Sequence, residues 1–201
     1  MQILFVNKQL LLVNKPSGLL SVPGRGEDKQ DCAIHRAQAQ FADALIVHRL
    51  DMATSGLLLM ARGAEMQRRL SMDFAARKVH KRYIALVTGR LAAEPEWQEV
   101  NLPLLTDWPN RPRQKIDFET GKPSLTRYRV LSSNEAQSRV ELEPVTGRTH
   151  QLRVHMLALG HPIVGDSLYG QATGGAMCLH ACSLRLPNWA CTLTAHRSSE
   201  P

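Results

Sequence analysis

The sequence has no apolar run near the roughly 20 residues that a membrane-spanning helix needs, and its N-terminus lacks the basic stretch and cleavage site of an export signal. Four cysteines occur without any CxxC spacing. A zinc site on Cys178, His180 and Cys182 would lack a second set of ligands. No GxxxxGK(S/T) or GxGxxG pattern is completed, so we predict no nucleotide site. We therefore expect a cytoplasmic protein with reduced thiols, no membrane association and no metal.

Acidic residues are in the minority, with 18 Asp and Glu against 25 Lys and Arg, which gives a net charge of +7. The excess is concentrated in residues 62–82 and in Arg111, Arg113 and Lys115, which are interleaved with Trp108 and two prolines. A solvated helix face would account for such clusters in a neutral protein. In a chain of net positive charge they favour a polyanionic partner, and we predict a nucleic acid.

Repeats, low-complexity tracts and linkers are also absent, so residues 1–201 are expected to form a single domain. Apolar periodicity predicts three helices, at residues 31–41 with Asp31 as N-cap, at 64–77, and from 147–149 to 159 with Gly160 ending it. It predicts about nine strands, at residues 3–6, 9–14, 57–61, 83–89, 97–102, 126–131, 139–143, 177–184 and 189–194. Residues 103–123 are expected to be irregular, either a hairpin or an extended insert. This mixture predicts an α+β fold on a largely antiparallel or mixed sheet.

One segment, Val47–Gly56, places Asp51 between a basic pair and a Thr-Ser-Gly turn, immediately before the apolar run 57–61. Rigid scaffolds often present a reactive side chain at such a strand mouth. An aspartate before Thr-Ser-Gly also commonly caps a turn through its own backbone. The local pattern alone leaves both interpretations open.

Four segments together carry a more specific signal: HRLDMATSG at 48–56, KRY at 81–83, TGRTHQLRVHM at 146–156 and LHA at 179–181. They resemble the RluA-type family of RNA pseudouridine synthases, whose patterns include HRLDxxTSG, a tyrosine after basic residues, GRxHQ(L/I)R and LHA. The opening NKPSG at 14–18 fits as well, so the resemblance covers nearly the whole chain. The insert at 107–123 resembles the RluA subgroup, which modifies a uridine in the tRNA anticodon loop and one in a 23S rRNA hairpin.

The resemblance implies a pseudouridine synthase fold, in which helices flank a central sheet with a catalytic cleft. It implies RNA as the partner and no cofactor, because moving the uracil link from N1 to C5 needs no redox step and no phosphoryl donor. Many family members carry an S4-like module at the N-terminus, and none is expected before Met1. We expect the protein to act as a monomer.

By the same resemblance, the catalytic residues are Asp51, Tyr83 and Arg148. Asp51 would act as a covalent catalyst, and attack on C1′, attack on C6 or removal of a sugar proton all remain open. Arg148 would keep the carboxylate ionised and oriented. Its alternative, a surface arginine at a helix N-terminus, is disfavoured by the helix dipole. Tyr83 would pack on the uracil and help remove the C5 proton, or it would be an ordinary half-buried strand tyrosine.

The remaining predicted site residues bind the substrate, whose target base must be flipped out of the RNA. Arg49 would fill the vacated space or contact phosphate, and His48 would be structural or phosphate-contacting. Leu179 would form the floor of the pocket or belong to the core, and Arg113 and Lys115 would contact RNA.

Two rival functions remain. One is an N-glycosidase, which would need a second acid to activate water, and no such acid accompanies the motifs. The other is a non-catalytic RNA-binding protein, which the charge and the stacking residues would fit.

Overall fold

The computed structural model describes residues 1–94, 96–171, 174–187 and 192–194. The chain divides into two compact units. Unit 1 comprises Met1–Lys81 and His180–Pro201, and unit 2 comprises Arg82–Leu179. The divisions fall within strand β5 (His80–Thr88) and after the first residue of strand β11 (Leu179–Arg185). No helix in the described ranges is long and apolar enough to cross a membrane.

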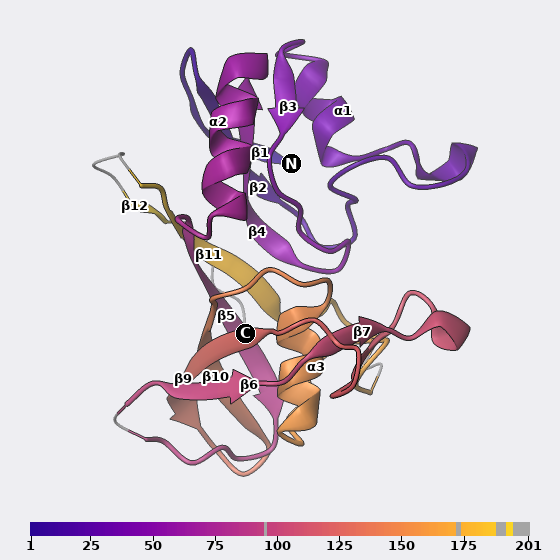
Figure 1. The fold of residues 1–201 in the computed structure, drawn as a ribbon, viewed down its shortest axis with the longest axis vertical. Helices are drawn as coiled ribbons and strands as arrows, with labels where there is room; N and C mark the ends of the chain where they lie inside the picture. Colours follow the sequence, from indigo (N-terminus) through magenta and orange to yellow (C-terminus); the bar gives the residue numbers. More distant parts are fainter. Residues whose placement is uncertain (95, 172–173, 188–191, 195–201) are drawn as a thin grey trace. The chain divides into compact units, whose positions relative to one another are not determined.

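Unit 1 is built on a mixed sheet (Figure 1). Its strands run in the order β1 (Gln2–Val6), β2 (Leu10–Lys15), β4 (Ser55–Arg62) and β11, while β3 (Ala44–Ile46) pairs with β4 and β12 (Thr192–Thr194) pairs with β11. The β4–β11 pair is parallel and the other pairs are antiparallel, so the predicted hairpin of β1 and β2 is confirmed. The sequence analysis missed the short strand β3, and residues 189–191 of the last predicted strand lie outside the described ranges.

The apolar runs of β2 and β4 form the centre of unit 1. Leu10–Val13 and Leu57–Ala61 are all at most 2% exposed. Helix α2 (Ala64–Ala75) packs on this core through Met66 and Leu70, and Phe74 adds a partly buried contact. The predicted amphipathic helix at 64–77 is therefore confirmed, because residues spaced by four lie on one face of a helix.

The first helix differs from its prediction. Helix α1 spans only Ala33–Gln38, after the short 3-10 helix Glu27–Lys29, and Cys32 is its N-cap. The prediction that Asp31 caps this helix is wrong. The Asp31 carboxylate instead accepts hydrogen bonds from Nε and Nη2 of Arg36, at 2.7 and 2.6 Å. A bidentate arginine is a stronger partner for a carboxylate than a neutral backbone amide.

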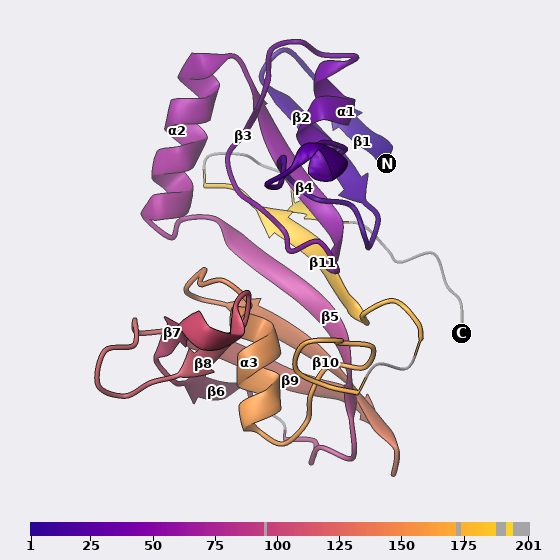
Figure 2. The same ribbon diagram turned by 90° about the vertical axis from the view of Figure 1, so that its right-hand side faces the viewer.

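Unit 2 contains an antiparallel sheet in the order β5, β10 (Gln137–Pro144), β9 (Leu125–Ser133) and β6 (Gln98–Asn101). These strands confirm the predicted ones. Residues 103–123 contain a hairpin, one of the two predicted forms, made of β7 (Leu104–Thr106), the 3-10 helix Trp108–Asn110 and β8 (Gln114–Ile116). Helix α3 (Gln151–Ala158) contacts β8, β9 and β10, and Figure 2 shows it beside the hairpin.

Helix α3 begins later than predicted and ends as predicted. His150 adopts a left-handed conformation, with φ of 53°, so residues 147–150 form a loop and the helix starts at Gln151. Gly160, with φ of 82°, follows the C-cap residue Leu159 and ends the helix. Mixed strand pairing with a few helices confirms the predicted α+β class.

Candidate active site

Asp51 lies in unit 1, on the loop that connects β3 to β4. The amide of Thr54 donates to the carbonyl of Asp51 at 3.1 Å, which closes a turn directly before the strand. Along this loop Arg49 is exposed, Leu50 is buried and Asp51 is half-buried. The loop therefore presents a carboxylate and a guanidinium from residues that flank a buried leucine.

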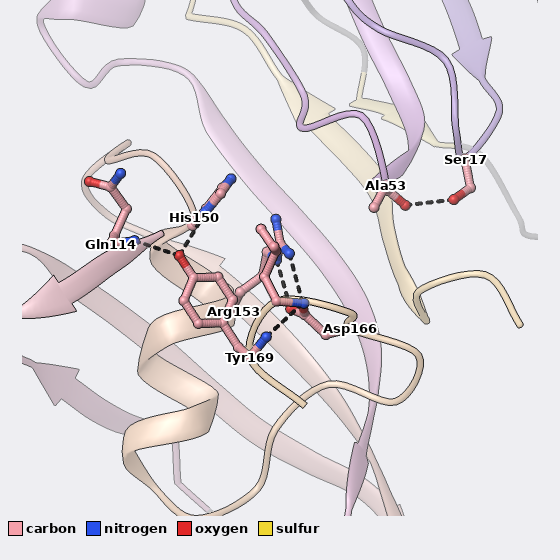
Figure 3. A network of polar contacts seen from close by, with 8 residues as sticks. Ser17, Ala53, Gln114, His150, Arg153, Asp166 and Tyr169 are labelled. Carbon is pink, nitrogen blue, oxygen red and sulfur yellow. Dashed lines mark hydrogen bonds and ion pairs between the residues drawn. The ribbon is translucent and has the colours of Figure 1, made fainter. Parts of the chain in front are cut away.

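A second loop holds the backbone on both sides of Asp51, and we call it the clamp segment (residues 15–21). The Ser21 hydroxyl donates to the Leu50 carbonyl at 2.7 Å and accepts from the Leu50 amide at 3.1 Å. The Ser17 hydroxyl donates to the Ala53 carbonyl at 2.7 Å (Figure 3). These bonds fix the main chain before and after the aspartate, so the direction of its side chain is restricted to a few rotamers.

Lys15 completes the clamp segment. Its ammonium is fully buried and donates to the carbonyls of Leu19, Pro16 and Met52 at 2.7, 3.0 and 3.1 Å. Burial lowers the pKa of Lys15 to about 8, and the negative charge of Asp51 acts in the opposite direction. A positive charge thus lies in the surroundings of Asp51 within unit 1 itself.

The sequence analysis did not assign this role to Lys15. The available signal was its position, because the lysine follows the apolar run of a strand that is buried on both faces. A charged side chain at the end of such a strand needs buried partners.

His48 ties the Asp51 loop to the core of unit 1. Its Nε2 accepts a hydrogen bond from the amide of Leu59 at 3.0 Å, and its ring stacks on Phe74 with centroids 4.6 Å apart. Burial, with a smaller contribution from the charge of Lys81, lowers the pKa of His48 to about 3. A neutral imidazole that accepts from β4 favours the structural interpretation over phosphate contact.

The Thr-Ser-Gly turn lies against the LHA motif through the parallel strands β4 and β11. Ser55 is opposite His180, and its hydroxyl lies 2.9 Å from the Nδ1 of that histidine. Gly56 has φ of 110°, and a Cβ on it would lie 2.3 Å from the Ala181 carbonyl oxygen. Glycine is therefore required here by both the backbone conformation and the close approach of β11.

The other two predicted catalytic residues belong to unit 2. Tyr83 lies on β5 opposite Leu142 of β10 and is 9% exposed. Arg148 is half-buried in the loop before α3, where its Nε donates to the Pro123 carbonyl at 3.4 Å. Leu179, the first residue of β11, is 3% exposed.

The side chain of Gln151 determines the shape of the Arg148 loop. Its Oε1 accepts from the Arg148 amide at 3.0 Å and from the Thr146 hydroxyl at 2.6 Å. Its Nε2 donates to the Leu125 carbonyl and the Thr126 hydroxyl at 2.9 and 3.0 Å. All its polar atoms are used, which accounts for a glutamine that is 3% exposed.

A buried ion pair joins α3 to the segment that follows it (Figure 3). Arg153 donates through Nε and Nη2 to the two carboxylate oxygens of Asp166, both at 2.7 Å. The two residues are 4% and 0% exposed. Hydrogen bonds from Arg153 and from two backbone amides hold the pKa of Asp166 below its usual value in spite of burial. The sequence analysis had no signal for Asp166 beyond its residue type, whereas Arg153 is the last arginine of the GRxHQ(L/I)R pattern and was not assigned a role there.

Arg113 and Lys115 are the predicted RNA-contacting residues of the insert. Arg113 directly precedes β8, and Lys115 lies on this strand. Both are exposed, and the Lys115 ammonium lies 3.4 Å from Asp117. Nearby, the guanidinium of Arg111 lies 4.5 Å from the ring centre of Trp108, whose own exposure is 65%. An exposed tryptophan and three cations form a surface suited to stacking and phosphate contacts.

A groove of about 570 Å³ opens in unit 1 where β4 ends and α2 begins, at the opposite end of β4 from Asp51. Its charged lining residues are Lys8, Arg62, Glu65, Arg68, Arg69 and Asp73. Arg62 is paired with Asp43 at 2.9 Å. The groove mixes both signs of charge and selects no ligand class. Within the described part of the chain, no group of three or more His, Cys, Asp or Glu residues is placed to hold a metal.

The fold defines the class of protein. A solved structure of Human RNA Pseudouridylate Synthase Domain Containing 1 aligns with a TM-score of 0.79 over 98% of this chain and 83% of that chain, at 30% identity. The architecture is thus the pseudouridine synthase fold, as predicted.

The sequence identifies the family. Residues 9–158 match the sequence profile described as RNA pseudouridylate synthase, and the chain belongs to this family. The dual-specificity RNA pseudouridine synthase RluA of Yersinia pestis is 49% identical over 189 residues, 92% of this chain and 91% of its own. The protein of that name from Escherichia coli (strain K12) is 49% identical over 176 residues, 87% of this chain and 80% of its own. The resemblance to RluA is confirmed, and the protein is an isomerase that acts on RNA.

Proposed function

We propose that this protein converts a uridine to pseudouridine in two structured RNA loops, the tRNA anticodon stem-loop and a 23S rRNA hairpin, with Asp51 as the nucleophile. Family membership supplies the reaction class. The relatives from Yersinia pestis and Escherichia coli bear the name dual-specificity, and this supports two RNA substrates. The basic hairpin of residues 104–116 supports an RNA surface beyond the target base.

The observation that carries the role of Asp51 is the clamp segment. Main-chain groups on both sides of Asp51 are held by Ser21, Lys15 and Ser17, each at 2.7 to 3.1 Å. A carboxylate on a rigid turn is already oriented before the substrate arrives, which lowers the entropy cost of reaching the transition state.

Arg148 and Tyr83 are proposed as the partners of this carboxylate at the uracil. The Gln151 network supports Arg148, because it fixes the backbone from which the guanidinium projects. Burial of Tyr83 on a sheet supports a ring that packs on a flat base and a phenol that assists loss of the C5 proton. Leu179 is proposed as the floor of the base pocket.

Base flipping is proposed to precede the chemistry, since a stacked uracil is out of reach of Asp51. Arg49 is exposed two residues before Asp51, which supports a guanidinium that replaces the extruded base in the stack. His48 is proposed to hold this loop to β4, close to any RNA that Arg49 contacts. Arg113 and Lys115 are proposed to contact phosphates.

We further propose that the whole chain acts as one catalytic domain and as a monomer in the cytoplasm. No cofactor is needed for the proposed reaction, because the product has the composition of the substrate and no electrons are exchanged.

The test compares Asp51→Asn with Asp28→Asn, an exposed aspartate of the same unit. Both variants should bind a tRNA or rRNA stem-loop within about threefold of the unsubstituted protein, because phosphate contacts dominate affinity. Only Asp51→Asn should abolish pseudouridine, mapped by carbodiimide-dependent stops of reverse transcription. Pseudouridine formation by Asp51→Asn would disprove the nucleophile. Release of free uracil by the unsubstituted protein would identify an N-glycosidase, and binding without either product would identify an RNA-binding protein.

A further inference from the structure

The phenol oxygen of Tyr169 joins two segments of unit 2 that are far apart in the sequence. It accepts a hydrogen bond from the amide of Gln114 at 2.7 Å and lies 2.7 Å from the Nδ1 of His150 (Figure 3). Gln114 begins β8 of the basic hairpin, and His150 directly precedes α3 in the GRTHQ motif. One oxygen atom therefore contacts both the basic hairpin and the loop of Arg148.

The contact of Tyr169 with the hairpin is made at the residue between its two exposed cations. Gln114 lies between Arg113 and Lys115, and alternate residues of a strand project to opposite faces. Strand β8 pairs only with the three-residue strand β7 in the described part of the chain. A short two-stranded hairpin is marginally stable on its own. A hydrogen bond at Gln114 therefore helps determine where both cations are presented.

The contact of Tyr169 with His150 is made at a residue whose backbone conformation is unusual. His150 has φ of 53°, a region that residues other than glycine seldom occupy. Its edge-to-face contact with the Tyr169 ring, with centroids 5.5 Å apart, adds to the polar contact. Both contacts favour this conformation, which directs the chain from Arg148 into α3.

Tyr169 is itself held in place by the buried ion pair. Its amide donates to Asp166 at 3.2 Å, and the guanidinium of Arg153 lies 5.0 Å from the centre of its ring. Since Asp166 and Arg153 are almost fully buried, the phenol projects from a rigid base.

We propose that Tyr169 is a positioning residue for RNA recognition: through its phenol oxygen it fixes the basic hairpin and the His150 loop in one arrangement. The proposal rests on the proposed function and adds to it, because it assigns a role in substrate affinity to a residue outside the predicted set of site residues. Its effect is on binding of the RNA more than on the chemical step, because the side chain of Gln151 also holds the Arg148 backbone, through a hydrogen bond of its own.

The first experiment compares Tyr169→Phe with Tyr128→Phe, which removes a phenol oxygen elsewhere in unit 2. Tyr169→Phe should weaken binding of an anticodon stem-loop about tenfold, which corresponds to about 1.4 kcal/mol and is the size of the net contribution of one hydrogen bond. It should raise KM similarly and change kcat by less than about threefold, and Tyr128→Phe should change neither. Hydrogen exchange at the Gln114 amide should be faster in Tyr169→Phe alone.

The second experiment changes Gln114, the donor of the hydrogen bond to the Tyr169 phenol oxygen. Gln114→Pro removes the donor amide, and Gln114→Ala retains it. Gln114→Pro should weaken RNA binding and Gln114→Ala should not. In a double-mutant cycle with Tyr169→Phe, the combined loss should be smaller than the sum of the single losses. The Gln114 pair also provides the test if Tyr169→Phe fails to fold.

Unchanged affinity in Tyr169→Phe, a fall in kcat alone, or strictly additive losses in the cycle would each overturn the proposal. These results are distinct from failure of the proposed function. If the unsubstituted protein forms no pseudouridine in either stem-loop, the proposed function fails, while binding measurements still decide the role of Tyr169. If it forms pseudouridine and the two phenylalanine variants behave alike, only the role of Tyr169 is lost.

Discussion

Replacement of Lys15 by methionine should remove a rise in the free energy of unfolding that the native protein shows between about pH 8 and pH 10.5. Methionine has a similar length and no charge, so the variant fills most of the same space. The ammonium of Lys15 is fully buried and its pKa is lowered from 10.5 to about 8 in the folded chain. The unfolded chain therefore binds more protons than the folded chain between these two values.

The sign and size follow from linkage. Stability rises with pH wherever the unfolded state binds more protons, so the lysine should make the folded protein gain stability from about pH 8 to pH 10.5. A shift of about 2.5 units at 1.36 kcal/mol each gives a gain of about 3 kcal/mol across this window. Below pH 8 the contribution of Lys15 should be constant. Near pH 7 the variant should still lose stability, because the carbonyls of Leu19 and Met52 lose their buried donor.

Urea unfolding followed by circular dichroism, at half-unit steps from pH 7 to 10.5, measures this effect. Other groups titrate in the same range, and subtracting the Lys15→Met curve removes their shared contribution. Lys78→Met, which replaces an exposed lysine after α2, is the matched control. The difference between the unsubstituted protein and Lys15→Met should rise by about 3 kcal/mol, and this rise should exceed any change in the difference for Lys78→Met, whose side chain is exposed. A flat or falling difference for Lys15→Met would refute the argument that its ammonium is buried at a cost.

Two further substitutions test the packing around the site. Gly56→Ala should destabilise the protein by more than about 3 kcal/mol, since its Cβ would overlap the β11 backbone, whereas Gly63→Ala, with φ of 81° and open space around it, should cost about 1–2 kcal/mol from backbone strain alone. Equal shifts of the unfolding midpoint would contradict this. Asp166→Asn should cost about 3–5 kcal/mol because it removes the negative charge from a buried ion pair that is held by two hydrogen bonds. The matched change Asp31→Asn, in an exposed pair, should cost under about 1 kcal/mol, and a loss as large as that of Asp166→Asn would disprove the reasoning.

Local patterns predicted most of the fold. The spacing of Met66 and Leu70 identified the buried face of α2, and the apolar runs around residues 10–13 and 57–61 identified the two central strands of unit 1. These features depend on residues that are close in sequence, and burial of one face leaves a periodic trace. The motifs also identified the family correctly.

Features that depend on distant partners could not be predicted in this way. Lys15 donates to the carbonyl of a residue 37 positions away. Because every residue type has a backbone carbonyl, no sequence pattern identifies this acceptor. The conformation of His150 is accompanied by contacts to Tyr169, 19 residues further along. Asp31 suited an N-cap by type, but Arg36 competes for its carboxylate. The roles of Tyr83 and Arg148 stay predictions.

The clamp segment holds the turn through carbonyls and one amide, groups that all twenty amino acids supply, except for the amide of proline. At position 52 the clamp segment contacts the backbone carbonyl, and the methionine side chain is 53% exposed. Substitution of Met52 would change the shape of the surface next to Asp51, but the backbone that orients the Asp51 carboxylate would stay in place. The side chain at position 52 can therefore vary without loss of the backbone contacts that hold Asp51.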